Sequence, residues 1–282
     1  MTDLDIEPGP VKAAAAPRQV VYRHRLPTRI WHWLNALVIL VMLMSGLMIF
    51  NAHPRLYWGQ YGANPDYAWL QIGDADDQGF LRVGDLTLRT TGFLGVWGGT
   101  GDDTMYTAFP GWLTIPSTYD LALSRHWHLT FAWLFVAAIV AYWIWGLFNR
   151  HIWRDLLPSR EELRPSHILE DAKNHALLRF PKGEAARRYN TLQKLSYLGV
   201  VLVLIPLQIL TGLTMSPGMD AAWPWLIDVF GGRPSARSIH FICAMLIVLF
   251  FFVHILMVAL VGPINEIWSM ITGRYRLPAE RQ

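Results

Sequence analysis

Four long apolar segments divide the chain, and polar stretches separate them. Each segment has about 20 residues, the length that an α-helix needs to cross the roughly 30 Å hydrocarbon core of a membrane. None of the four contains an Asp or Glu residue. The pattern predicts an all-α membrane protein, a four-helix transmembrane bundle, with spans at about residues 30–50, 126–148, 195–213 and 239–261.

The polar connections differ in length and pattern. Residues 51–120 form a connection too long to be a passive link, so we expect a large loop cap on one membrane face. Within it, residues 80–89 alternate around a Gly-Asp pair, which predicts a short β-hairpin. In the connection 149–194, residues 161–178 predict an amphipathic helix at the membrane surface.

The composition supports a membrane protein. Hydrophobic residues make up 53% of the 282 residues and charged residues only 16%, whereas soluble domains carry about 25% charge. The 14 Trp residues suit the membrane boundary. The one cysteine, Cys243, excludes a disulfide framework, a thiolate-held iron-sulfur cluster and covalent CxxCH haem attachment. A metal would therefore need histidine or another ligand.

The charges predict the orientation. Residues 1–29, 149–194 and 262–282 together carry 18 Lys and Arg residues, whereas 51–120 and 214–237 carry five. Because basic residues gather on the cytoplasmic side, both termini are predicted to be cytoplasmic. The net charge of +3 then reflects topology and indicates no nucleic-acid partner. The predicted domains are a cytoplasmic tail at 1–29, a transmembrane domain at 30–261 with a periplasmic insertion at 51–120 and a cytoplasmic connection at 149–194, and a cytoplasmic tail at 262–282.

Histidines inside the spans are the candidate functional groups, because ionisable residues are costly in a membrane. His32 lies near the inner end of the first span and His128 near the outer end of the second. In the fourth span, His240 lies near the outer end and His254 near the inner end. Their spacing of 14 residues is about 21 Å along one helix face. We therefore expect an outer pair, His128 with His240, and an inner pair, His32 with His254, each able to give two axial imidazoles to one haem.

An arginine precedes three of these histidines by three residues, on the same helix face and one turn nearer the water. These residues are Arg29, Arg125 and Arg237. A guanidinium binds a carboxylate through two hydrogen bonds, so we expect these side chains near haem propionates. The alternative is that each marks a membrane boundary and contacts lipid phosphate.

Other interpretations of the histidines stay open. His126 competes with His128 as the outer ligand, and a lone histidine in a span can join helices by hydrogen bonding. His53 is expected to be a loop residue. Four glycines in the spans could let helices or a macrocycle approach closely: Gly46, Gly146, Gly199 and Gly212. The third span, which has no histidine, is expected to close the bundle.

These features together resemble the bacterial cytochrome b561 family, the di-haem cytochrome b subunits of nickel-iron hydrogenases, formate dehydrogenases and thiosulfate reductases. The resemblance covers residues 22–275 and rests on RHRLPTRIWHWLNA, on RHWH and on the two histidines of the fourth span. FPGWLTIPS, YNTLQKLSYLGV, LTGLTMSPGMDAAWPW and GPINEIWSMITGRY are most similar to the thiosulfate-reductase-type branch, whose members often accompany a molybdopterin oxidoreductase. The large cap departs from the shorter loops of the other two branches.

The resemblance implies a multi-pass protein of the bacterial inner membrane that holds two b-type haems with bis-histidine iron. It would carry electrons between the quinone pool and a partner oxidoreductase, here a periplasmic molybdopterin enzyme. The cap is acidic, and we consider both a solvated surface and a docking site for a periplasmic redox protein. The alternatives are a histidine-based transporter for metal or protons and a structural membrane anchor. Such a transporter is expected to have Asp or Glu residues in its spans.

Overall fold

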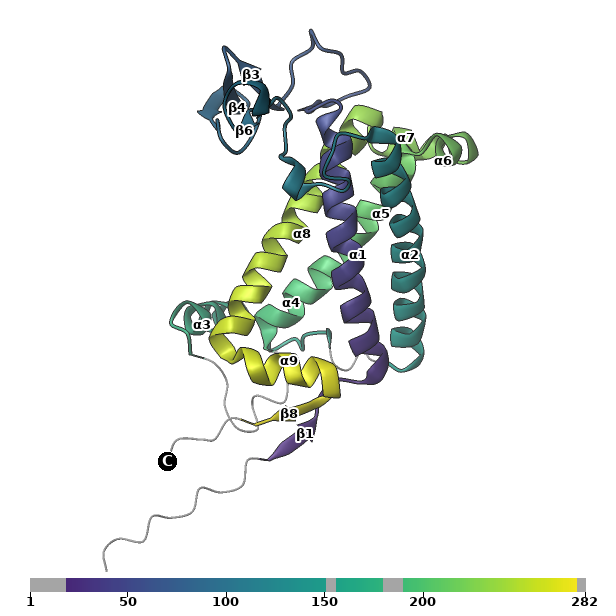
Figure 1. Ribbon diagram of the computed structural model, residues 1–282. Helices are drawn as coiled ribbons and strands as arrows, with labels where there is room; N and C mark the ends of the chain where they lie inside the picture. Colours follow the sequence, from purple (N-terminus) through teal and green to yellow (C-terminus); the bar gives the residue numbers. More distant parts are fainter. Residues whose placement is uncertain (1–18, 151–155, 180–189, 278–282) are drawn as a thin grey trace, which may run out of the picture.

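The computed structural model describes residues 19–150, 156–179 and 190–277. Four helical segments are long and apolar enough to cross a membrane, and they stand together as one bundle with a cap at one end (Figure 1). This arrangement confirms the predicted fold class. The first 18 residues of the predicted N-terminal tail lie outside the described residues.

The four spans form two closely packed helix pairs. α1 (Leu26–Asn51) packs along α2 (Leu121–Phe148), and α5 (Ile205–Met215) of the third span packs along α8 (Arg233–Val261). Each helical segment includes the span predicted from the sequence and extends it at one end or both. A buried apolar cluster joins α1, α2 and the middle of the third span, and consists of Val38, Phe135, Ile139, Tyr142, Val201 and Ile205.

The third span is built from three consecutive helical pieces. α4 (Thr191–Gly199) leads into a π-helical turn, η5 (Val200–Leu204), and then into α5. Pro206, in the first turn of α5, has no N–H for the carbonyl four residues earlier, and its ring crowds that carbonyl. The wider π turn before it accommodates this mismatch and keeps the span continuous.

The connection between α1 and α2 folds into a β-rich unit, called the cap here (residues 52–120). Its main sheet is antiparallel with the order β2-β3-β4-β5. The predicted hairpin is confirmed, with Val83 paired opposite Leu86 across the turn. The bounds are β2 (Arg55–Leu56), β3 (Leu70–Ala75), β4 (Gln78–Val83), β5 (Leu86–Arg89), a second small sheet of β6 (Trp97–Gly98) and β7 (Thr104–Met105), and the 3₁₀ turns η1 (Gly101–Asp103) and η2 (Gly111–Leu113).

Hydrogen bonds attach the cap to the first turns of α8. The Trp69 indole donates to the Ser238 hydroxyl at 2.9 Å, and that hydroxyl donates to the Tyr57 carbonyl at 2.6 Å. One turn earlier, the Ser235 hydroxyl accepts from the Gly59 amide at 2.7 Å. The cap is therefore fixed directly above one end of the bundle.

A small helix and a strand pair close the opposite end (Figure 1). α9 (Pro263–Thr272) lies beneath the spans, and β8 (Arg274–Arg276) pairs with β1 (Val20–Tyr22) in an antiparallel register. The sequence pattern did not indicate this pairing, because three-residue strands are too short to show an alternation.

Three further helices in the described part of the chain lie outside the spans. α3 (Pro165–Ala176) falls within the amphipathic segment predicted from the sequence and packs near the start of α4. There the Asp171 carboxylate accepts from the Thr191 amide at 3.0 Å. α6 (Pro217–Ala222) and α7 (Trp225–Val229) connect the third span to α8 at the cap end.

Candidate functional site

The structure brings the four predicted histidines together as two pairs. His128 on α2 faces His240 on α8, with ring centroids 6.3 Å apart and ring planes at 60°. His32 on α1 faces His254 on α8, with centroids 6.2 Å apart and planes at 57°. We call His128 and His240 the cap-end pair, and His32 and His254 the α9-end pair. Both pairs bridge the two helix pairs of the bundle.

The separation within each pair fits two imidazoles that bind one metal from opposite sides. Two metal–nitrogen bonds of about 2 Å each would span about 4 Å of the 6.2–6.3 Å between ring centroids. The remainder corresponds to the distances from the two coordinating nitrogens to their own ring centres. Among the described residues, no group of three or more His, Cys, Asp and Glu side chains could hold a metal ion. Pairs alone suit a metal whose other positions are filled by a macrocycle, as in haem.

α1 orients the first ligand of the cap-end pair. The Nδ1 atom of His128 lies 3.0 Å from the Met42 carbonyl and 3.1 Å from the Ser45 hydroxyl. Because a carbonyl only accepts, Nδ1 must carry the proton, which leaves Nε2 with its lone pair free for a metal.

α5 orients the second ligand of the cap-end pair. The Nδ1 atom of His240 lies 3.0 Å from the Thr211 hydroxyl, and its Nε2 lies 2.8 Å from the Gln208 amide nitrogen. Binding of a metal at Nε2 requires the Gln208 side chain to release this contact. The side-chain oxygen of Gln208 is buried without a hydrogen-bond partner among the described residues. Only the nitrogen end of this amide is therefore hydrogen-bonded.

A glycine lies against each ligand of the cap-end pair. A Cβ atom added to Gly46 would lie 3.3 Å from Cε1 of His128, and one added to Gly212 would lie 3.3 Å from Cε1 of His240. Such contacts are tighter than ordinary van der Waals contact. The close approach expected of the glycines is therefore, at Gly46 and Gly212, an approach to the ligand rings, whereas a Cβ atom added to Gly199 would meet nothing within 4 Å.

Buried polar atoms without partners mark the α9-end site. On α1, the hydroxyl of Thr28, Nε of Arg29, Nδ1 of His32 and the carbonyl oxygen of Asn35 are buried and have no hydrogen-bond partner among the described residues. Positions 28, 32 and 35 share one helix face. Because buried polar groups in native proteins are almost always paired, this stripe fits a site that takes a polar group, such as a haem propionate.

The three predicted arginines have different surroundings. Arg29 is half-buried beside the α9-end pair, and Arg237 is half-buried one turn before His240. Arg125 is exposed on α2. His126 is also exposed on α2 and belongs to neither pair, so the geometry favours His128 as the ligand.

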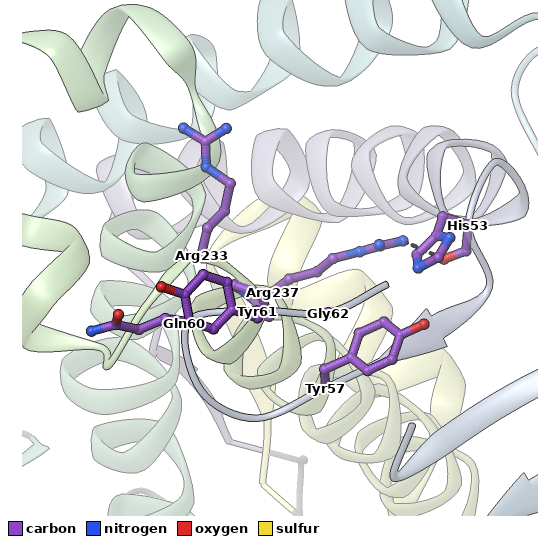
Figure 2. A pocket seen from close by; sticks show the side chains of 8 residues that line it. His53, Tyr57, Gln60, Tyr61, Gly62, Arg233 and Arg237 are labelled. Atoms are coloured by element: carbon purple, nitrogen blue, oxygen red, sulfur yellow. Dashed lines mark hydrogen bonds between the residues drawn. The ribbon is translucent and has the colours of Figure 1, made fainter. Parts of the chain in front are cut away.

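A pocket of about 370 Å³ opens beside Arg237 at the cap end (Figure 2). The Arg237 guanidinium donates to the His53 carbonyl at 2.7 Å. The His53 ring stacks on Tyr57 with centroids 5.7 Å apart, and the Tyr57 hydroxyl is buried without a partner among the described residues. Burial, and then the charges of Arg237 and Arg55, lower the pKa of His53 below its usual value, so its ring is neutral at pH 7.

The sequence pattern indicated the four histidines but missed several neighbours. Ser45, Thr211 and Gln208 contact the cap-end ligands, and Tyr57 lines the pocket above them. The third span had been expected only to close the bundle, and α5 in fact supplies two of these side chains. A serine or threonine directly before each glycine was the available signal.

Comparisons with known proteins show what the chain is similar to. The family described as prokaryotic cytochrome b561 matches residues 23–273. A protein of Azospira oryzae, described as a proposed protein-methionine-sulfoxide reductase subunit and named YedZ1, is 29% identical over 150 residues, which cover 52% of this chain and 69% of the relative. No solved structure matches the chain.

Proposed function

The chain belongs to the prokaryotic cytochrome b561 family and is an electron-transferring membrane cytochrome that binds haem b, and from this premise we propose that it binds two haems, one at each histidine pair. The observation that carries the proposal is the pair of matched separations, 6.3 Å at the cap end and 6.2 Å at the α9 end. Two histidines at each site would serve as ligands and would leave no ligand position free for a substrate. Haem so bound supplies one-electron transfer.

The residues of this chain would hold each group in place. His128 and His240 would bind at the cap end, and His32 and His254 at the α9 end. Arg29, with the polar stripe on α1, is suited to propionates at the α9 end. Arg237 is suited to them at the cap end, where its guanidinium faces a pocket open to water. Arg125, which is exposed, is a weaker candidate.

A transporter is the less well supported alternative. The four membrane-spanning helices contain no Asp or Glu residue that could carry protons or neutralise a metal ion. The histidines stand in twos at opposite ends of the bundle, and a pair alone would leave most positions around a bare metal ion without a protein ligand.

We further propose that the protein lies in the bacterial inner membrane with the cap in the periplasm and both termini in the cytoplasm. It would exchange electrons between the quinone pool and a periplasmic catalytic subunit, a molybdopterin enzyme. The charge distribution supports this orientation, and the relative that is described as a reductase subunit supports a partner of this kind.

The direct test is reduction of the purified protein in lipid vesicles by a quinol. Absorbance should show reduction of haem by menaquinol or ubiquinol analogues, and reoxidation when the partner is added with its substrate. If neither quinol reduces the haem while dithionite does, the quinone part of the proposal is wrong.

The cap is the proposed docking surface for that partner. Asp74, Asp76 and Asp77 lie exposed at and beside the β3–β4 turn, and Tyr106 donates to the Asp77 carboxylate at 2.8 Å. An acidic surface steers a basic partner, and salt should weaken the encounter. Replacing the three aspartates by asparagine should slow electron exchange with the partner and leave the haem spectra unchanged. Exchange at the original rate would place the partner elsewhere.

A further inference from the structure

The two cap-end ligands are held by the same short motif on two different helices. Ser45-Gly46 of α1 contacts His128, and Thr211-Gly212 of α5 contacts His240. In each motif the hydroxyl reaches Nδ1 of the histidine, and the glycine lies against the same ring. The hydroxyl fixes the rotation of the imidazole ring, and the glycine, which has no side chain, leaves room for that ring.

The hydroxyls have a defined direction of hydrogen bonding. The Ser45 hydroxyl lies 2.7 Å from the Val41 carbonyl, and the Thr211 hydroxyl lies 2.6 Å from the Leu207 carbonyl. Each hydroxyl hydrogen is therefore donated along its own helix. Toward the histidine each oxygen can only accept, so Nδ1 carries the proton and Nε2 is the free nitrogen.

Each of the two ligands has a backbone carbonyl partner as well as its hydroxyl. His128 also has the Met42 carbonyl 3.0 Å from Nδ1, so removal of the Ser45 hydroxyl leaves one acceptor in place. His240 likewise has the backbone carbonyl of Gln208 as a hydrogen-bond partner beside the Thr211 hydroxyl. At the α9 end, Nδ1 of His32 is buried and has no partner among the described residues.

We propose that Ser45 and Thr211 are positioning residues that set the orientation and the electron-donating strength of the cap-end ligands. This inference rests on the proposed function. An acceptor on Nδ1–H makes an imidazole a stronger donor to its metal. A stronger donor favours oxidised iron, so these hydroxyls lower the midpoint potential of the cap-end haem.

Four variants with two matched controls test the proposal in the purified, haem-loaded protein. Thr211→Val and Ser45→Ala remove the hydroxyls, Thr211→Ser keeps one, and Thr211→Val/Ser45→Ala removes both. The controls are Thr214→Val on α5 and Ser124→Ala on α2, whose buried hydroxyls donate to carbonyls of their own helices. Haem content is measured first, then the midpoint potential of each haem and the low-temperature EPR spectrum of each ferric haem.

We expect the cap-end potential to rise in Thr211→Val and in Ser45→Ala, and to rise most in the double variant. Thr211→Ser, Thr214→Val and Ser124→Ala should stay at the wild-type value. Loss of the cap-end haem alone in Thr211→Val, with both haems kept in Thr211→Ser, also supports the role. Unmoved potentials and EPR spectra in Thr211→Val, or equal shifts in Thr214→Val, overturn it. Wild-type protein without haem would instead overturn the proposed function.

Discussion

At the scale of single residues, the sequence of a membrane helix does not show which of its buried hydroxyl groups contact a histidine on a neighbouring helix. Ser45, Ser124, Thr211 and Thr214 are all buried in spans and all donate to carbonyls of their own helices. Only Ser45 and Thr211 also reach a histidine on a neighbouring helix. The histidines were predictable because a polar ring in a span needs a partner and because their depths match. Which hydroxyls reach them depends on helix rotation, which a sequence does not contain.

Alanine substitutions at the histidines separate the two sites. His128→Ala and His240→Ala should each lose the cap-end haem, and His32→Ala and His254→Ala the α9-end haem, because each removes one of two axial ligands. Haem per chain should fall by half in each variant, as measured by the pyridine haemochrome assay and by EPR. His126→Ala is the matched control on α2 and should keep both haems. If His32→Ala and His240→Ala remove the same signal, the pairing is wrong.

At the scale of elements, helix positions followed from the sequence more readily than helix partners. Each predicted span is present, and so is the hairpin of β4 and β5, because long apolar runs and strict alternation are local signals. The pairing of α1 with α2 and of α5 with α8, and the four-stranded order of the cap sheet, join residues far apart in the chain. The strand β2 has two residues, too few to show an alternation, and only its pairing with β3 defines it.

The glycine beside a ligand ring gives a prediction at this scale. Gly212→Ala places a methyl group 3.3 Å from His240, so the ring must shift and the cap-end haem should show a changed EPR spectrum or reduced occupancy. Gly199→Ala is the matched control in the same span, where an added Cβ meets nothing within 4 Å. It should stabilise the helix by up to about 1 kcal/mol and leave both haems unchanged. Equal spectra in the two variants would show that Gly212 does not limit the site.

For the whole molecule, the cap is the feature that gives the bundle two different ends. It is attached to α8 through Ser235 and Ser238, within two turns of His240. One proposed haem therefore lies beneath a folded cap, and the other lies above α9 and the β1–β8 pair (Figure 1). The sequence indicated that the long connection would fold. Its attachment to α8 could not be predicted, because Ser235 and Ser238 are ordinary residues for the first turns of a helix.

Cysteine labelling in intact cells tests the proposed orientation. Ala75→Cys and Asp102→Cys lie on the exposed surface of the cap, and Glu161→Cys lies exposed near α3 at the other end. An impermeant maleimide should label the first two from the periplasm and label the third only after the membrane is opened. The native Cys243 is buried and should give little background. The opposite labelling pattern would reverse the orientation and the side of the partner.

The central claim is that two histidine pairs hold two haems, and the most direct measurement is the haem-to-protein ratio of the purified protein. A pyridine haemochrome assay with quantitative amino-acid analysis should give two b-type haems per chain, all extractable by acid acetone because the chain has no CxxCH site. Redox titration of the same sample should resolve two components. A ratio of one haem per chain, or haem that stays with the protein after extraction, would contradict the account.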